Sequence, residues 1–264
     1  MAVESGGHSG MKPLFFVGLH KPQHAYQFKR CMISINVLER RRSDFTVNDW
    51  LLDSGAFTRI KTGRGHMLVE DYARQIIRWS QCGNLIAAVA QDWMCEPFIL
   101  KITGLTVKEH QHRTVDNFME LRKLVPEDIY IMPVLQGYTS EEYVAHIHMY
   151  GDLLKPGMLV GVGSVCKRNG NPKAIEAILR AIKDERPDLQ LHGFGLKKTA
   201  LTSPLVNLYL KECDSAGWSL AERMKGGDAN GPAGAHRYVK ALENMPIQMV
   251  LGPGLLLELS EEYV

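Results

Sequence analysis

The sequence predicts an α/β protein folded as an irregular TIM (β/α)8 barrel, and three observations carry this prediction. The chain has 264 residues, of which 45% are hydrophobic and 23% are charged, a balance typical of one globular domain with a substantial core. Apolar runs of strand length alternate with amphipathic segments of helix length, as in repeated β-α units around a parallel sheet. No Pro/Gly/Ser-rich linker divides the chain, and single α/β barrels commonly reach about 250 residues. We therefore expect one domain over residues 1–264, with 1–12 as a disordered N-terminal extension.

The apolar runs locate the expected strands. An open doubly wound sheet is the alternative architecture, but its phosphate-binding fingerprint, G-x-G-x-x-G after the first strand, is missing. The nearest match, Gly161-Val162-Gly163, lies late in the chain and lacks the third glycine. The barrel is therefore favoured, and its strands are expected within 14–19, 50–57, 84–92, 129–137, 158–165, 189–195 and 247–252.

Helices are expected between these strands. Apolar residues from Val69 to Ile77 recur with the spacing of a helix that packs one face on a sheet. Two Thr-x-x-Glu sequences match the capping box, in which a hydroxyl and a carboxylate satisfy free N–H groups of the first turn. An Asn-Pro pair is a third helix start, with the Asn as the cap. These starts are Thr106 with Glu109, Thr139 with Glu142, and Asn171-Pro172.

Composition excludes several classes of protein. No segment has the roughly 18 apolar residues of a membrane-spanning helix, and the N-terminus lacks the basic start and apolar core of a signal peptide, so a cytoplasmic protein is expected. The net charge of +2 does not by itself indicate a polyanionic partner. The cysteines are odd in number and widely spaced, which favours reduced thiols and predicts no metal site and no cofactor. They are Cys31, Cys82, Cys95, Cys166 and Cys213.

Polar residues stand at the carboxyl ends of several expected strands. Because these ends share one face of a barrel, side chains that are far apart in sequence would converge there, as in barrel enzymes. Asp53 could instead cap a turn, and Gln136 could be a structural amide. Asp92 follows an apolar run and would be costly to bury without a partner. His192 ends a further strand, and Gly161, Gly163, Gly193 and Gly195 permit either tight turns or close approach of a flat ligand.

Basic residues also follow the strand ends, in three clusters. They could belong to ordinary solvated loops. Clusters that surround one mouth of a barrel could equally contact the phosphates of a nucleic acid. Phe57, Trp93 and Phe194 stand nearby and could either stack on a base or pack in the core. The basic clusters are Arg59, Lys61 and Arg64; Lys167 and Arg168; and Lys197 and Lys198.

Six segments of the sequence form a distinctive set: LDSGAF (52–57), AVAQDWMCEP (88–97), PVLQGYT (133–139), VGVGSVCKR (160–168), LHGFGLK (191–197) and ECDSAGWS (212–219). In order and spacing, they resemble the queuine tRNA-guanine transglycosylase superfamily. The resemblance spans about residues 14–219 and is closest to the branch associated with 7-deazapurine modification of DNA. It implies an irregular TIM barrel that exchanges a nucleobase at an N-glycosidic bond.

The resemblance also implies roles for individual residues. Asp53 matches a general acid/base aspartate, and Asp214 matches the nucleophilic aspartate, although the residues after Asp214 depart from the tRNA enzymes. The basic clusters would contact nucleic acid. Base-binding positions would be Ser54, Phe57, Asp92, Gln136, Gly161, Val162, Gly163, His192 and Gly193.

The tRNA enzymes carry a zinc subdomain with a CxCxxC motif, and none of the cysteines here supplies it. This favours DNA over tRNA as the partner, with a flipped-out guanine exchanged for a free 7-deazaguanine derivative. Alternatives are a DNA glycosylase that hydrolytically excises a modified base, as in defence against phages, a tRNA-guanine transglycosylase-like enzyme, and a non-catalytic nucleic-acid-binding subunit. Retention of both Asp53 and Asp214 argues against the last.

Overall fold

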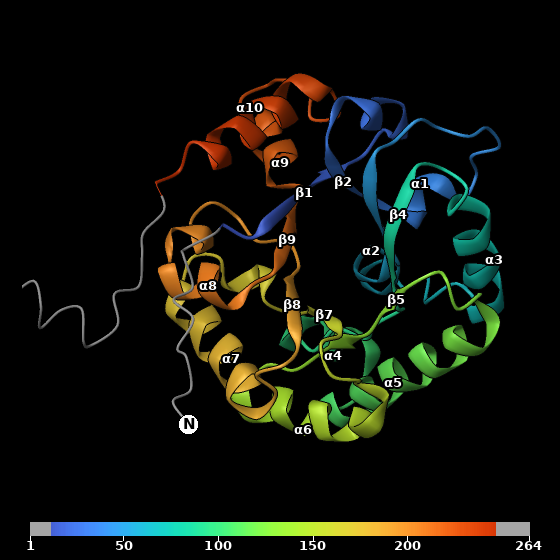
Figure 1. Cartoon of the computed structure of the whole chain (residues 1–264), viewed down its shortest axis with the longest axis vertical. Coiled ribbons are helices and arrows are strands. Elements are labelled where there is room, and N and C mark those ends of the chain that lie inside the picture. Colours follow the sequence, from blue (N-terminus) through green and yellow to red (C-terminus); the bar gives the residue numbers. More distant parts are fainter. Residues whose placement is uncertain (1–11, 247–264) are drawn as a thin grey trace, which may run out of the picture.

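A ring of parallel strands surrounded by helices forms the body of the protein in the computed structural model, which describes residues 12–246 (Figure 1). Every pairing in the sheet is parallel, and the strand order is β5-β4-β3-β2-β1-β9-β8-β7-β6. The strands are β1 (Leu14–Leu19), β2 (Arg30–Ser34), β3 (Asp49–Asp53), β4 (Asn84–Val89), β5 (Ile131–Met132), β6 (Val134–Leu135), β7 (Leu159–Val162), β8 (Gln190–Gly193) and β9 (Glu212–Ser215).

The ring closes through one interrupted strand. β5 and β6 lie at opposite ends of the strand order, yet only Pro133 separates them in the chain. Proline has no N–H to donate to a ladder, so the strand changes partner there. On one side Ala90 N donates to Met132 O at 3.0 Å, and on the other Gly161 N donates to Pro133 O at 2.9 Å. Counting β5 and β6 as one strand gives eight strand positions, which confirms the irregular (β/α)8 barrel.

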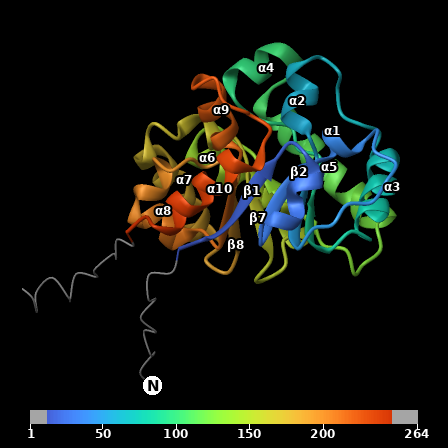
Figure 2. The same cartoon turned by 90° about the horizontal axis from the view of Figure 1, so that it is seen from above.

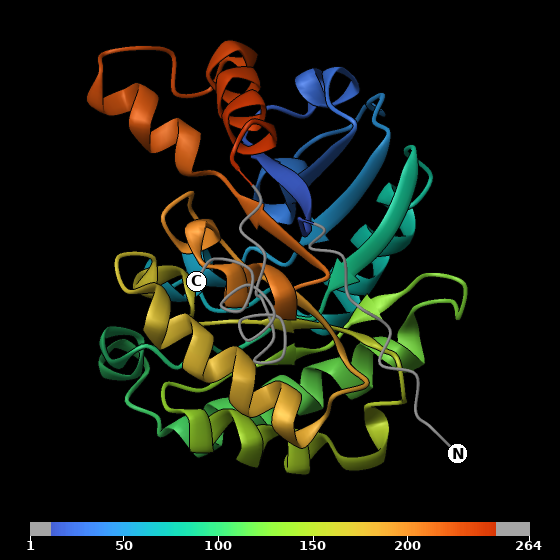
Figure 3. The same cartoon turned by 60° about the vertical axis from the view of Figure 1, so that its left-hand side comes forward.

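The helices cover the outside of the ring, and α5 to α7 are visible as the green and yellow helices of Figure 3. Short 3-10 turns at Pro22–Gln27, Gly151–Leu153, Cys166–Arg168 and Ala200–Thr202 complete the connections. The α-helices are α1 (Ile35–Leu38), α2 (Ala56–Lys61), α3 (Val69–Trp79), α4 (Pro97–Thr103), α5 (Val107–Leu124), α6 (Ser140–Tyr150), α7 (Pro172–Glu185), α8 (Pro204–Tyr209), α9 (Gly217–Met224) and α10 (Pro232–Glu243).

The predicted helix starts are confirmed by their hydrogen bonds. Glu109 N donates to Thr106 Oγ1 at 3.2 Å while Thr106 N donates to Glu109 Oε2 at 2.8 Å, so both halves of the capping box are present. The same reciprocal box caps α6. At α7, Ala174 N donates to Asn171 Oδ1 at 3.3 Å. These caps begin three of the helices that carry the chain back across the outside of the barrel.

The sequence analysis missed two strands, β2 and β9. β9 reads ECDS and is buried along its whole length, but its polar side chains hide it from a search for apolar runs. β2 is short and begins at a charged residue, Arg30. The segment 50–57 was predicted as one strand, whereas β3 ends at Asp53 and α2 begins at Ala56. The strand expected within 247–252 and the extension expected at 1–12 lie outside the described residues, except for Lys12.

Among the helices of residues 12–246, none is both long and apolar enough to cross a membrane.

Gly83 provides a test of the packing between neighbouring β-α units. Its φ is +56°, and a Cβ there would lie 2.2 Å from Val47 O, whereas Gly157, with φ +77°, has open space around it. Ala at either site should cost roughly 1–2 kcal/mol for the left-handed backbone. We expect Gly83→Ala to destabilise the protein more than Gly157→Ala, because only the former clashes with backbone. Urea unfolding of both variants measures the difference, and equal losses would contradict this packing.

Candidate active site

The carboxyl ends of the parallel strands gather the polar residues at one end of the barrel, where α2, α4 and α9 lie (Figure 2). Asp53 is the last residue of β3, Asp92 follows β4, Gln136 follows β6, and Asp214 lies in β9. Gly55 turns the chain from β3 into α2 with φ +69°, which keeps Asp53 at the strand end. The structure therefore brings Asp53, Asp92 and Gln136, which the strand-end pattern predicted at this face, together with Asp214, which the resemblance indicated.

A chain of hydrogen bonds runs from Asp92 and Gln136, which were expected to bind the base, through Ser164 to Glu96. Gln136 Nε2 donates to Asp92 Oδ2. Ser164 Oγ lies 2.7 Å from Gln136 Oε1 and 3.0 Å from Glu96 Oε2, and it accepts from Cys95 N at 3.0 Å. A hydroxyl has one proton to donate, so all these contacts are satisfied when Ser164 donates to Gln136 and a protonated Glu96 donates to Ser164.

Burial supports that arrangement. Glu96 is 2% exposed, and burial raises the pKa of its carboxyl group above the usual value, which favours the protonated form. Ser164 has φ +54°, a left-handed conformation that is uncommon outside glycine. The contacts of its hydroxyl hold it there. The chain thus fixes the Gln136 amide with its nitrogen toward Asp92.

Two of the aspartates have raised pKa values. Burial raises the pKa of Asp53 to about 6, and the charge of Asp214 adds to this, while hydrogen bonds from Ser34 and Gly55 oppose it. Burial also raises the pKa of Asp92 to about 7, assisted by the charge of Asp53 and opposed by the Gln136 hydrogen bond. Both carboxyl groups can therefore exchange a proton near neutral pH, which is the property of a general acid/base.

Asp214 lies in a different environment, against a buried histidine. His192 Nε2 is 3.2 Å from Asp214 Oδ1, and His192 Nδ1 is 2.9 Å from Glu212 Oε1. Gly195 N also donates to Asp214 Oδ1, at 3.0 Å. Burial alone would lower the pKa of His192, but the hydrogen bonds and charges of Asp214 and Glu212 outweigh it and raise the pKa to about 9. At neutral pH the ring is an imidazolium held between two carboxylates.

Several residues that were expected to bind the base do not lie on a surface that a ligand could contact directly. His192 is fully buried, and both of its ring nitrogens are engaged by carboxylates, so the structure makes it a support of Asp214. Val162 is buried in the core. A Cβ at Gly161, Gly163 or Gly193 would meet the side chain of Phe194, Gln136 or Leu196, respectively, so these glycines make room for neighbouring side chains.

Ser54 and Phe57 flank the start of α2. Ser54 is 1% exposed, and its Oγ finds no hydrogen-bond partner within the described chain. Phe57 packs on Phe98, with ring centroids 6.1 Å apart. Lys167 Nζ lies 5.0 Å from the Phe57 ring centroid and 5.7 Å from that of Phe98. Phe57 is therefore already covered by a cation, in a geometry that stabilises both groups.

Some residues of the basic clusters are exposed, whereas others already contact neighbouring groups of the protein. Arg59 is only 7% exposed and pairs with Glu39 at 3.1 Å, so its predicted role as a surface phosphate contact does not fit its position. Lys61, Arg64 and Lys197 are exposed. Arg168 donates to Tyr138 O and lies over the Tyr138 ring. Lys198 is half-buried.

Glu96 and Glu212 are the site residues that the sequence analysis missed. A signal existed for Glu212, because residues two apart on a strand point to the same side, which places its side chain beside that of Asp214. Glu96 follows Asp92 by one helical turn in sequence but lies on a loop, so no periodicity identified it.

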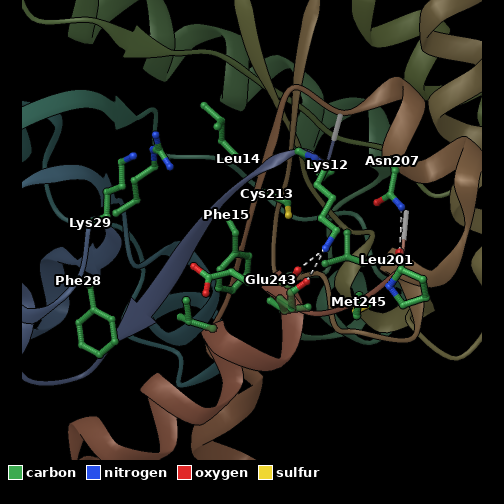
Figure 4. A pocket seen from close by; sticks show the side chains of 15 residues that line it. Lys12, Leu14, Phe15, Phe28, Lys29, Leu201, Asn207, Cys213, Glu243 and Met245 are labelled. Carbon is green, nitrogen blue, oxygen red and sulfur yellow. Dashed lines mark hydrogen bonds between the residues drawn. The ribbon is translucent and has the colours of Figure 1, made fainter. Parts of the chain in front are cut away.

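A cavity of about 230 Å³ lies at the opposite end of the barrel, beside the first residues of β1 and β2 (Figure 4). Its lining is mostly apolar, and Lys12 Nζ donates there to the backbone oxygens of Leu242 and Glu243. No aspartate within residues 12–246 lines it. We therefore place the candidate active site at the carboxyl ends.

Throughout residues 12–246, no group of three or more His, Cys, Asp and Glu side chains is arranged to hold a metal ion.

The fold and this site define a (β/α)8 barrel protein with carboxylates of contrasting environment at its carboxyl face, the arrangement of barrel enzymes. Residues 11–241 match the family model described as DpdA, DeoxyPurine in DNA protein A, and the chain belongs to this family. The resemblance to the DNA-modification branch is thereby confirmed. A search of curated proteins finds no match.

The raised pKa of Asp92 predicts a pH-dependent stability effect. Its folded value of about 7 lies above the ordinary 3.8, so ionisation destabilises the fold increasingly as pH rises between these values. Asp92→Asn should stabilise the protein at pH 8 by roughly 1–3 kcal/mol, and the gain should shrink toward pH 5. Thermal unfolding at both pH values measures it.

Asp188 is the matched control, because the hydrogen bond from Arg186 lowers its pKa to about 2. Asp188→Asn should therefore lose stability at pH 8. If Asp92→Asn lost stability at pH 8 as well, the burial of a costly charge at Asp92 would be refuted.

Proposed function

We propose that this protein exchanges guanine in DNA for a 7-deazaguanine base by displacement at the N-glycosidic bond. Membership of the family implies a transglycosylase-type enzyme that acts on DNA. The observation that supports displacement at the N-glycosidic bond is the contrast between Asp53 and Asp214. Asp53 has a pKa raised to about 6, whereas Asp214 lies against an imidazolium with one oxygen held by two donors. Carboxylates in such different environments suit different roles.

Asp214 is the proposed nucleophile. Its Oδ2 forms a bond to C1′ of the sugar while the bond from C1′ to the base nitrogen breaks, and the electron pair leaves with the base. Protonated Asp53 gives its proton to the departing base. In the second half, Asp53 takes the proton from the ring nitrogen of the incoming base, which attacks C1′, and Asp214 is released as a carboxylate.

Asp92 and Gln136 are the proposed readers of the base. A guanine edge presents a ring N–H and an amino group beside a carbonyl oxygen. The Asp92 carboxylate can accept from the former groups, and the second Nε2 hydrogen of Gln136 can donate to the carbonyl. The contact with Asp92 opposes turning of the amide, because a flipped amide would place its carbonyl oxygen against the Asp92 carboxylate, and the Ser164 hydroxyl holds the amide oxygen on the other side. The same contacts suit a 7-deazaguanine, which keeps this edge.

A base within a duplex cannot reach such a pocket, so the target nucleotide has to be flipped out at a cost of a few kcal/mol. Exposed and half-buried cations around the site can offset this cost by contacts to phosphates. The proposed contacts are Lys61, Arg64, Lys167, Arg168, Lys197 and Lys198.

The proposed function is tested by incubating the protein with guanine-containing DNA, with and without free 7-deazaguanine bases, and identifying the products by mass spectrometry. Exchange predicts released guanine and incorporated deazaguanine, with both requiring the free base. Abasic sites formed without added base would establish hydrolytic excision instead. A parallel reaction with tRNA tests the substrate, and exchange in tRNA without exchange in DNA would reverse the assignment.

The two aspartates should behave differently when neutralised. Asp214→Asn removes the charge and keeps the volume, so it should abolish covalent protein-DNA adduct while DNA binding changes little. Asp53→Asn should slow base exchange by roughly 10²- to 10⁴-fold, because the proton-transfer group is lost and the nucleophile remains. Denaturing gels detect the adduct, and fluorescence anisotropy measures DNA binding.

Asp116→Asn is the matched control, since Asp116 is exposed on α5, and it should leave both measurements unchanged. An adduct formed by Asp214→Asn, or full turnover of that variant, would remove Asp214 as the nucleophile.

A further inference from the structure

We propose that His192 and Glu212 form a positioning pair that holds Asp214 through both halves of the exchange reaction. The proposal rests on the proposed function, because Asp214 is the nucleophile that the pair would serve. His192 and Glu212 are positioning residues, since neither is placed to touch the reacting atoms.

The local structure of β8 and β9 creates this arrangement. The two strands are neighbours in the ring (Figure 1), and His192 pairs in register with Glu212. Glu212 and Asp214 are two residues apart on β9, so their side chains point to the same side. The imidazole of His192 fits between them, with one ring nitrogen facing each carboxylate. All three side chains are buried, and His192 is completely so.

In the described structure, the charge of His192 is balanced by Asp214 and Glu212. Phe16 of β1 and Phe194, which follows β8, cover the ring, with centroids 6.3 Å and 4.7 Å from that of His192. Two further titratable groups, Tyr130 and Cys213, lie near Glu212. Asp53, Cys166 and Tyr238 lie near Asp214. An imidazole that donates to two carboxylates needs a proton on both nitrogens. A buried cation of this kind is stable only while it is paired.

The pair orients the nucleophile by occupying one of its oxygens. Asp214 Oδ1 accepts from both His192 Nε2 and Gly195 N, whereas no donor in the described chain contacts Oδ2. The backbone of Asp214 is held as well, because Leu196 N donates to its carbonyl oxygen at 2.9 Å. Oδ2 is therefore the oxygen free to bond to C1′.

Glu212 has a separate task while the covalent intermediate exists. When Oδ2 bonds to C1′, the Asp214 carboxylate becomes a neutral ester and no longer balances the imidazolium. Glu212 still contacts His192 Nδ1 and keeps the proton on the ring, so no proton has to move. When the incoming base attacks C1′, the released carboxylate regains the same charged donor at Oδ1. One carboxylate alone could not serve both states.

The test uses Glu212→Gln in the full-length protein, with Glu176→Gln as the matched control, because Glu176 is a half-buried carboxylate in α7 that accepts from Ser203 Oγ. NMR of protein labelled at histidine follows the His192 ring, assigned by its absence in His192→Gln. Single-turnover base exchange in DNA is measured beside it.

We expect the wild-type His192 ring to titrate near pH 9. Glu212→Gln should lower this midpoint by at least about one pH unit, because a neutral amide replaces a charged partner. The rate of exchange should fall roughly 10- to 100-fold with DNA affinity unchanged, the range typical when a supporting partner is removed. Glu212→Asp keeps the charge and should retain the high midpoint, so it serves if Glu212→Gln fails to fold.

An unchanged His192 titration midpoint in Glu212→Gln would overturn the positioning pair. A midpoint in Glu212→Asp as low as that of an ordinary imidazole would do the same. Exchange at the wild-type rate in Glu212→Gln would do the same. If the wild-type protein exchanged no base in any DNA, the proposed function would fail, while the NMR titration would still decide whether the charged pair exists.

Discussion

Closure of the parallel ring at Pro133 sets the arrangement of the candidate active site. The interrupted strand of β5 and β6 joins the two edges of the sheet, so the carboxyl ends of β3, β4, β6 and β9 face a common space. Asp53, Asp92, Gln136 and Asp214 meet there although more than 150 positions of sequence separate the first from the last. An open sheet would leave these residues along a line, with no shared space for one ligand.

Within that space, burial and pairing give chemically similar groups different properties. Asp92 is buried and Asp53 is half-buried, no cation contacts either of them in the described structure, and their pKa values rise toward neutrality. Asp214 instead contacts an imidazolium that Glu212 also contacts. In the proposed function, these different environments suit the aspartates to different roles, proton transfer for Asp53 and nucleophilic attack for Asp214. The stability given up by burying Asp53 and Asp92 is the expected cost of such a site.

The sequence predicted the barrel, most of its strands and three helix caps, because these depend on local periodicity and on hydroxyl or amide groups near the first turn. It missed β9, since a strand whose buried side chains are Glu212, Cys213 and Asp214 carries little apolar signal. It also placed Arg59 at the surface, whereas Glu39, twenty positions earlier, draws it inward. Pairings of this kind depend on which segments become neighbours, and a single sequence does not contain that information.

The candidate active site could be predicted only in part for the same reason, because a single sequence does not show which segments become neighbours. Asp53, Asp92 and Gln136 were identified because polar residues at strand ends are unusual, and Asp214 was identified by resemblance. The support behind them, formed by Glu96, Ser164, His192 and Glu212, consists of contacts between different strands and loops. These contacts decide which atoms are free to react, and they became visible only in three dimensions.

The oxygen of Asp214 left free by His192 and Gly195 is the atom that we propose bonds to the sugar of the target nucleotide. The most direct test of this bond is peptide mapping of the protein-DNA complex trapped during turnover and digested with trypsin, which cleaves after Lys211 and Arg223. We expect the peptide spanning residues 212–223 to carry the sugar, attached at Asp214. Attachment at Asp53 or Asp92, or base exchange without any covalent peptide, would contradict it.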